Sequence, residues 1–93
     1  MIHFLVHDTK DNVGVAVVDI QAGTHCAGKI LANNQPVEAD ATEAIALGHK
    51  IALHELAVGD TVIEYDCPIG KVVKAIKAGQ LVHVHNLKTK RWA

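Results

Sequence analysis

AIALGHKIALHEL, residues 44–56, recurs without gaps as AIKAGQLVHVHNL, residues 75–87. Each segment runs from a small apolar turn through a glycine into a strand-like stretch that carries a histidine near its end, and DIQAG, residues 19–23, repeats the opening. Glycine is typical of turns, and short apolar stretches bounded by turn residues are typical of strands. The repeated segments therefore predict turn-and-strand units related by an approximate internal two-fold, rather than a solenoid, which needs more copies.

The rest of the chain shows the same alternation of short apolar stretches and turn residues. We expect strands over residues 2–6, 13–18, 37–39, 49–53, 61–65, 72–73 and 81–84, the first two forming a hairpin around the polar turn 8–12. Residues 41–47 are expected to form one or two short helical turns, because Thr42 can cap a helix and Glu43 suits a first turn. The sequence therefore predicts a mainly β fold in a single domain over residues 1–93.

Composition narrows the classes of function. Hydrophobic residues make up 49% of the chain and aromatic residues only 3%, so the core must be built from Val, Ile, Leu and Ala, without a deep aromatic-lined pocket. Nine basic and ten acidic residues are mixed along the chain, and this balance does not predict the basic surface that nucleic-acid binding requires. The segment Met1–Asp8 resembles neither a signal peptide nor a membrane span, so we expect a cytoplasmic protein. Cys26 and Cys67 are expected to be buried or half-buried thiols, because two distant cysteines form no disulfide framework.

Seven histidines are unusual in so short a chain. His83 and His85 lie two residues apart in the last predicted strand, where alternate residues share a face. Two imidazoles on one face can both bind a metal ion, or one can bind it while the other moves a proton. Asn86 could orient a ligand or a substrate hydroxyl. Taken alone, the pair fits an exposed strand edge better than a metal site.

A second candidate pair follows a glycine turn, where the backbone can approach a ligand closely. Here Lys50 could hold a carboxylate and His49 could act as an acid or a base, although a solvated polar turn is the alternative. His54 is interpreted as structural, and one of His3 and His7 as a hydrogen-bonded core histidine.

Four motifs in order resemble one known family: GHKIAL at 48–53, GDTV at 59–62, PIG at 68–70 and VHVHNL at 82–87. They are similar to the SAF-type domain of altronate and galactarate dehydratases, and the resemblance extends from residue 3 to the end. The ending, residues 86–92, is most similar to the stand-alone small subunits of sulfolactate lyases in this family. The resemblance implies a β-clip fold and a large catalytic subunit as partner.

Enzymes of this family are understood to remove the α-proton of an anionic 2-hydroxy acid and to expel a group from the β-carbon. The resemblance thus implies one chain of a two-chain lyase, inactive alone, that releases sulfite from sulfolactate or water from a sugar acid. The developing enediolate needs positive charge or a metal ion nearby. The family implies a divalent metal, Fe(II), shared with or held by the large subunit. A non-catalytic binding or assembly module remains the alternative from another class.

With the resemblance, the candidate residues take roles. His49, Lys50 and His85 are the catalytic candidates, Asn86 and Lys88 the substrate-binding candidates, and His83 and His85 the metal ligands. The tail, residues 88–93, carries three cations and one tryptophan. Such a tail can bind an anionic substrate or dock on the large subunit.

Overall fold

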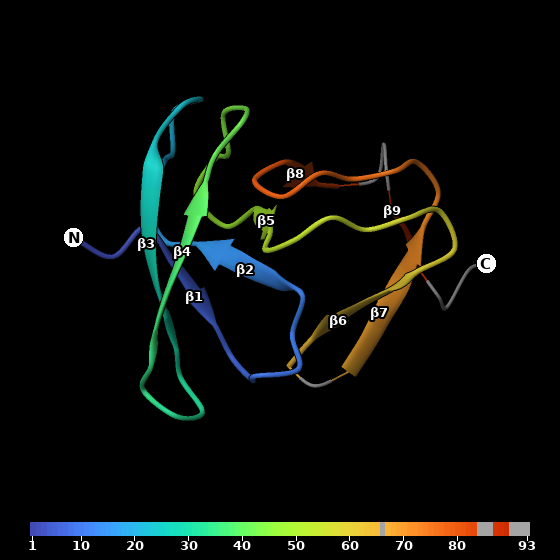
Figure 1. Cartoon of the computed structure of the whole chain (residues 1–93), viewed down its shortest axis with the longest axis horizontal. Helices are drawn as coiled ribbons and strands as arrows, with labels where there is room; N and C mark the ends of the chain where they lie inside the picture. The colour runs from blue at the N-terminus through green and yellow to red at the C-terminus, as the bar shows by residue number, and fades with distance from the viewer. Residues whose placement is uncertain (66, 84–86, 90–93) are drawn as a thin grey trace.

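The computed structural model describes residues 1–65, 67–83 and 87–89 of the chain. The strands in this part are β1 (Phe4–Val6), β2 (Val13–Ala16), β3 (His25–Ile30), β4 (Pro36–Asp40), β5 (Lys50–Ala52), β6 (Thr61–Glu64), β7 (Cys67–Val72), β8 (Leu81–Val82) and β9 (Leu87–Thr89). They form a six-stranded sheet in the order β4-β3-β1-β2-β5-β8 and a three-stranded sheet in the order β6-β7-β9 (Figure 1). The predicted mainly β class is confirmed.

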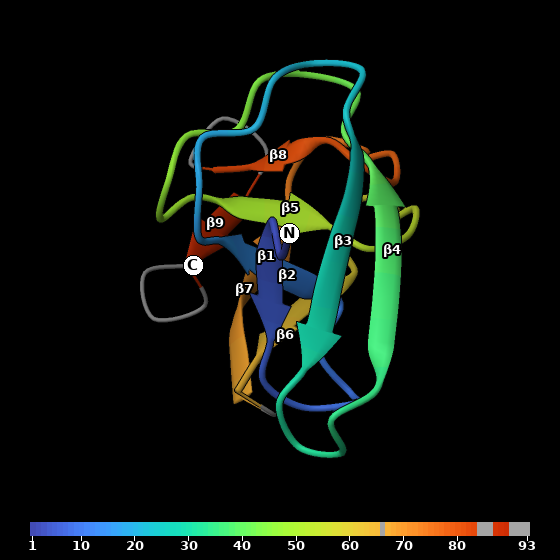
Figure 2. The ribbon, with the colours of Figure 1, turned by 90° about the vertical axis from the view of Figure 1, so that its left-hand side faces the viewer.

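The helical turns expected over residues 41–47 are not formed. Ile45 instead makes an antiparallel bridge to Ile20, in which each amide donates to the other's carbonyl at 2.8 and 2.9 Å. The N–H and C=O groups of Ile45, which a helix would use for bonds four residues apart, thus bond to Ile20 instead. The sequence also missed β3, which pairs with β1 and with β4 and forms with β4 the long hairpin seen beside β1 in Figure 2. Its small residues, such as Gly28, have low strand propensity.

Four units of one pattern build the turns, at residues 16–24, 41–49, 52–60 and 72–80. The first residue of each unit is a buried aliphatic residue that follows or ends a strand, the fifth is a buried Ile or Leu, and the eighth is a glycine with φ between 85 and 95°. In chain order the fifth residues are Ile20, Ile45, Leu56 and Ile76. A glycine is needed there because L side chains rarely adopt such φ values.

The four units pair reciprocally. In the first pair, Gly23 donates its N–H to Ala41 at 2.7 Å while Gly48 donates to Ala16 at 2.8 Å. In the second pair, at residues 52–60 and 72–80, each glycine likewise donates to the first residue of the opposite unit, at 2.9 Å. Reciprocal pairing therefore occurs twice, but not between the two segments for which the sequence predicts a two-fold. Those segments, 44–56 and 75–87, meet instead through the antiparallel pairing of β5 with β8.

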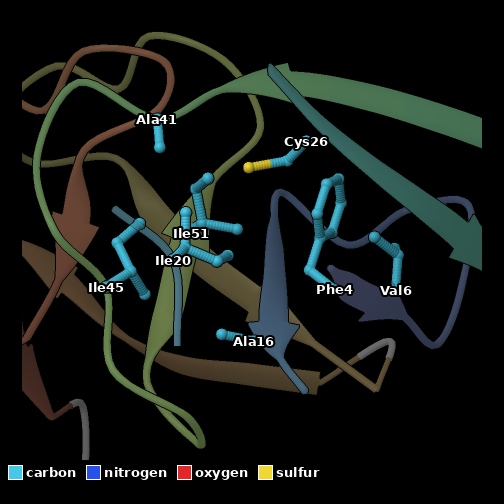
Figure 3. Packing of buried hydrophobic residues seen from close by; sticks show 8 residues of the cluster. All are labelled: Phe4, Val6, Ala16, Ile20, Cys26, Ala41, Ile45 and Ile51. Atoms are coloured by element: carbon cyan, nitrogen blue, oxygen red, sulfur yellow. The ribbon is translucent and has the colours of Figure 1, made fainter. Parts of the chain in front are cut away.

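Two hydrophobic clusters fill the domain. The first, shown in Figure 3, contains Phe4, Val6, Ala16, Ile20, Cys26, Ala41, Ile45 and Ile51. The second joins the two sheets and contains Val13, Ala52, Leu56, Val62, Val72, Ile76 and Val82. Phe4 lies against two glycines, because a Cβ at Gly14 or Gly28 would come within 2.5 or 2.4 Å of its ring.

The β1–β2 connection joins the second sheet through buried polar side chains. Asn12, only 8% exposed, donates from Nδ2 to the carbonyl of Thr61 at 3.0 Å and accepts from the amide of Ile63 at 2.8 Å. Its own amide donates to the Ile63 carbonyl at 3.1 Å. These bonds place the connection beside β6, as Figure 1 shows.

The two cysteines are free, and they differ in exposure. Cys26 is buried in the first cluster, and this burial raises the pKa of its thiol. Cys67 is exposed at the start of β7, so the expectation of a buried or half-buried thiol is wrong for this residue. No helix in the described part is long and apolar enough to cross a membrane.

Candidate functional site

His49 and His83 come together at one end of the six-stranded sheet. The antiparallel pairing of β5 with β8 sets Lys50 opposite Val82, so His49, which precedes β5, and His83, which follows β8, are brought close together. The ring centroids of the two histidines are 5.2 Å apart with an interplanar angle of 57°. His49 is half-buried and His83 is exposed. The structure thus joins one predicted catalytic residue to one predicted metal ligand.

The other predicted site residues near the end of the chain cannot be placed in the same way. His85 and Asn86 lie outside the described residues, and so do residues 90–93 of the predicted tail. The backbone of Lys88 lies in β9, opposite Lys71. The predicted pair of His83 and His85 on one strand face therefore stays a prediction.

His49 differs from the residues at the same place in the other three units. The last side chain of each of those units bonds to the backbone of the residue three positions earlier: Thr24 to Gln21 at 2.7 Å, Asp60 to Ala57 at 2.8 Å and Gln80 to Lys77 at 2.8 Å. His49 keeps the common backbone bond, from its amide to Ala46 at 3.0 Å. Its Nδ1, however, is buried and has no hydrogen-bond partner among the described residues. A buried polar atom without a partner calls for an explanation, and a functional role is one.

Lys50 lies on the opposite face of the sheet from His49, because successive strand residues alternate. Across the sheet, Lys50 pairs with Val15 of β2, and Val15 pairs with Leu5 of β1. Leu5 pairs in turn with Lys29 of β3. All four side chains are half-buried. The structure therefore places Lys50 with a second cation on a largely apolar face, and does not bring it to the histidine pair.

The described residues do not complete a metal site. Among them, no group of three or more His, Cys, Asp and Glu side chains gathers as metal ligands. His49 and His83 offer at most two imidazole ligands, so any further ligand must come from elsewhere. The fit of this chain to the expected metal is therefore partial.

Sequence reasoning missed a histidine that bridges two carboxylates on the β3–β4 hairpin. His25 contacts Asp40 through Nδ1 and Glu38 through Nε2, each at 2.5 Å. The hydrogen bond to Asp40, followed by that to Glu38, raises the pKa of His25. Strand alternation could have placed Glu38 and Asp40 on one face, but without β3 their partner was not identifiable.

A second cluster that the sequence did not reveal joins the β1–β2 connection to the β6–β7 turn. Tyr65 has a φ of 58°, and its ring stacks on His7 with centroids 3.5 Å apart and planes inclined by 22°. Its amide donates to the carboxylate of Asp11 at 2.9 Å. By contrast, His3 accepts the amide of Ala27 at 3.0 Å, so it is hydrogen-bonded as predicted, but it is half-buried and not part of the core.

Comparison with known proteins assigns the chain to a family. Residues 2–90 match the altronate/galactarate dehydratase SAF domain. The chain is 46% identical over 92 residues to the (2R)-sulfolactate sulfo-lyase subunit alpha of Chromohalobacter salexigens, and 98% of each chain is covered. It is also 46% identical over 63 residues to the protein of the same name from Paracoccus pantotrophus, which is 68% of this chain and 94% of that protein.

Longer relatives contain the same domain. The altronate dehydratase of Escherichia coli is 42% identical over 79 residues, which are 85% of this chain but 15% of the dehydratase. The family model covers nearly the whole chain, and the identity to the first relative extends from end to end. The chain therefore belongs to the family of altronate/galactarate dehydratase SAF domains.

Proposed function

We propose that this chain is the small subunit of a two-chain carbon–sulfur lyase that eliminates sulfite from sulfolactate to give pyruvate. The observation that carries the proposal is the 46% identity, over 98% of both chains, to a protein named as subunit alpha of such an enzyme. A relative of the same length that is named as a subunit supports a separate large subunit. We expect that the small chain is inactive without it.

The proposed reaction is a β-elimination. A base removes the proton from C2 of sulfolactate, the electron pair left there forms a C2–C3 double bond, and the C3–S bond breaks so that sulfite leaves with its electrons. The enol then takes a proton at C3, loses its hydroxyl proton and becomes pyruvate. We assign the proton transfer at C2 to His49, because imidazole is the commonest general acid or base, the ring lies beside that of His83, and its Nδ1 is not engaged by the described residues.

The remaining roles follow from where the side chains lie. We propose that His83 holds a divalent metal, Fe(II), together with ligands of the large subunit, and that the metal would stabilise the enediolate. Lys50 faces away from His49 and shares its sheet face with Lys29, so we assign it to attracting the dianionic substrate rather than to contacting the reacting atoms. His85, Asn86 and Lys88 keep their predicted roles as proposals.

A hydro-lyase that releases water from a sugar acid is the second candidate. The 42% identity to the Escherichia coli altronate dehydratase favours it, and the 36% identity over 88 residues to the enzyme of Bacillus subtilis supports it too. Those residues are only 15% and 16% of the two enzymes, however, whereas the subunit-alpha relative matches in full length. We therefore prefer the sulfo-lyase.

The test is reconstitution with matched histidine variants. The chain is co-expressed with its large subunit, and the purified complex is assayed with Fe(II) for sulfite release from sulfolactate and for turnover of altronate. His49→Gln is expected to lower kcat by roughly 10²–10⁴-fold, the usual contribution of a general acid or base. His54→Gln is the control, because His54 is exposed and, among the described residues, its side chain bonds only to the neighbouring Glu55 carbonyl. Full activity of His49→Gln would support a non-catalytic module instead.

A further inference from the structure

Tyr65 is held in a backbone conformation that disfavours it. Of the six described residues with positive φ, four are glycines and one is Asn34, which tolerate the left-handed region, whereas Tyr65 does not. The buried carboxylate of Asp11, only 6% exposed, accepts the Tyr65 amide at 2.9 Å and the Asp8 amide at 3.2 Å. A glycine would form this turn with less strain, yet the sequence has a tyrosine here and a buried carboxylate that binds the backbone of the turn. The conformation indicates that the ring is needed there.

The ring is fixed but largely uncovered. The ring stacks on His7. The backbone carbonyl of His7 accepts the amide of Ala32 at 3.0 Å, so the residue under the tyrosine ring is itself held in place. Tyr65 nevertheless remains 58% exposed. It is the only aromatic residue among the exposed large hydrophobic residues of the described part. A rigid, exposed tyrosine is typical of the anchor residues at protein interfaces, since burying it costs little conformational entropy.

The relatives indicate which partner covers the Tyr65 ring. In the two dehydratases this domain is 15% and 16% of a single chain, so most of the enzyme is covalently joined to it. The subunit-alpha relative has nearly the length of this chain and is named as a subunit, so we expect the remaining part of the enzyme to be a separate polypeptide. Such a small domain must then hold its partner through side chains on its own surface.

We infer that Tyr65, stacked on His7 and fixed by Asp11, is the anchor on which the large subunit docks. The inference rests on the proposed function, because it requires a separate large subunit. The anchor is distinct from the histidine pair: His49 and His83 flank β5 and β8, whereas Tyr65 follows β6 and bonds to Asp11 of the β1–β2 connection, which runs beside β6 in Figure 1. The large subunit would thus be held at Tyr65 and would also reach the histidine pair, where it supplies the further metal ligands.

Affinity measurements with matched variants test the anchor. Tyr65→Asn removes the ring and keeps a residue that tolerates positive φ, while Val58→Asn removes an aliphatic side chain of similar exposure, 64% against 58%. With immobilised large subunit, Tyr65→Asn is expected to raise Kd by at least about tenfold, the range of interface anchors, and Val58→Asn by no more than about twofold. Equal effects of the two variants would overturn the inference. If the wild-type chain itself did not bind, the proposed function would fail, and the anchor with it.

A measurement without substitution guards against a variant that unfolds. Tyr65 is the single tyrosine of the chain, so 3-fluorotyrosine labelling gives one ¹⁹F resonance. In the complex with unlabelled large subunit this resonance is expected to shift and to lose its solvent-isotope effect. A resonance that does not change at saturation would overturn the inference. An unchanged Kd with a raised KM for sulfolactate in Tyr65→Asn would overturn it as well, because the ring would then meet substrate.

Discussion

At the scale of single residues, His25 makes stability depend on pH. Its contacts with Asp40 and Glu38 raise its pKa above the ordinary 6.5. A raised pKa means that the stabilisation is complete below the unfolded-state pKa and is lost as pH rises through the folded-state pKa. The melting temperature of wild type should therefore exceed that of His25→Gln most below about pH 6, and the difference should vanish in alkaline solution.

Titration of the His25 ring by NMR gives the control for this prediction. In Asp40→Asn the pKa of His25 should fall back toward its ordinary value, because the substitution removes the carboxylate that raises this pKa most. A melting-temperature difference that stays constant across the pH range would contradict the prediction.

His49 shows how far a single residue could be predicted. The glycine turn before it marked it as a candidate, but no contact between His49 and His83 was predicted. That contact depends on the register of β5 against β8, which is set by long-range hydrogen bonds and not by local pattern. The loss of the side-chain bond present in Thr24, Asp60 and Gln80 can likewise be recognised only once the four units are superimposed.

At the scale of elements, two glycines with the same conformation should respond differently to alanine. Gly23 and Gly79 have φ values of 87 and 85°, but a Cβ at Gly23 would meet nothing within 4 Å, whereas at Gly79 it would lie 1.7 Å from the carbonyl oxygen of Asp40. The strain of the left-handed region costs both variants roughly 1–2 kcal/mol. Gly79→Ala must also displace backbone, so we expect it to lose more than about 3 kcal/mol or to fail to fold. Urea unfolding of both variants measures this, and equal losses would contradict it.

The elements themselves were predictable where apolar residues alternate between turn residues. The β1–β2 hairpin and the strands at β4, β5 and β6 were found in this way. β3 was missed because Ala27 and Gly28 interrupt the pattern with small residues, which are needed where the Phe4 ring packs. Residues 41–47 were taken as helical because Thr42 and Glu43 suit a helix start, and the pairing of Ile45 with Ile20 overrides that local preference.

At the scale of the whole molecule, two reciprocal pairs of turn units hold two sheets around two clusters of buried residues. The two pairs also bond to each other, because the Thr42 amide of the first pair donates to the Gly79 carbonyl of the second at 3.0 Å. The second cluster provides apolar contact between the sheets through residues such as Val13 and Val62. The directional contacts between the β1–β2 connection and the second sheet include Asn12, whose amide side chain reaches both Thr61 and Ile63. Its role follows from contacts almost fifty residues apart in the chain, which no local pattern predicts.

The last prediction concerns this connection. Asn12→Ala removes two side-chain hydrogen bonds and leaves the carbonyl of Thr61 and the amide of Ile63 without them, so the free energy of unfolding should fall by about 2–4 kcal/mol. Asn33→Ala is the control: Asn33 is exposed and its side chain bonds only to the nearby amide of Gln35, so the loss should stay below about 1 kcal/mol. If Asn12 couples the two sheets, amide hydrogens of β6 and β7 should exchange before those of β1 and β3 in Asn12→Ala. Uniformly faster exchange in both sheets would show instead that the hydrophobic contact alone makes the domain one cooperative unit.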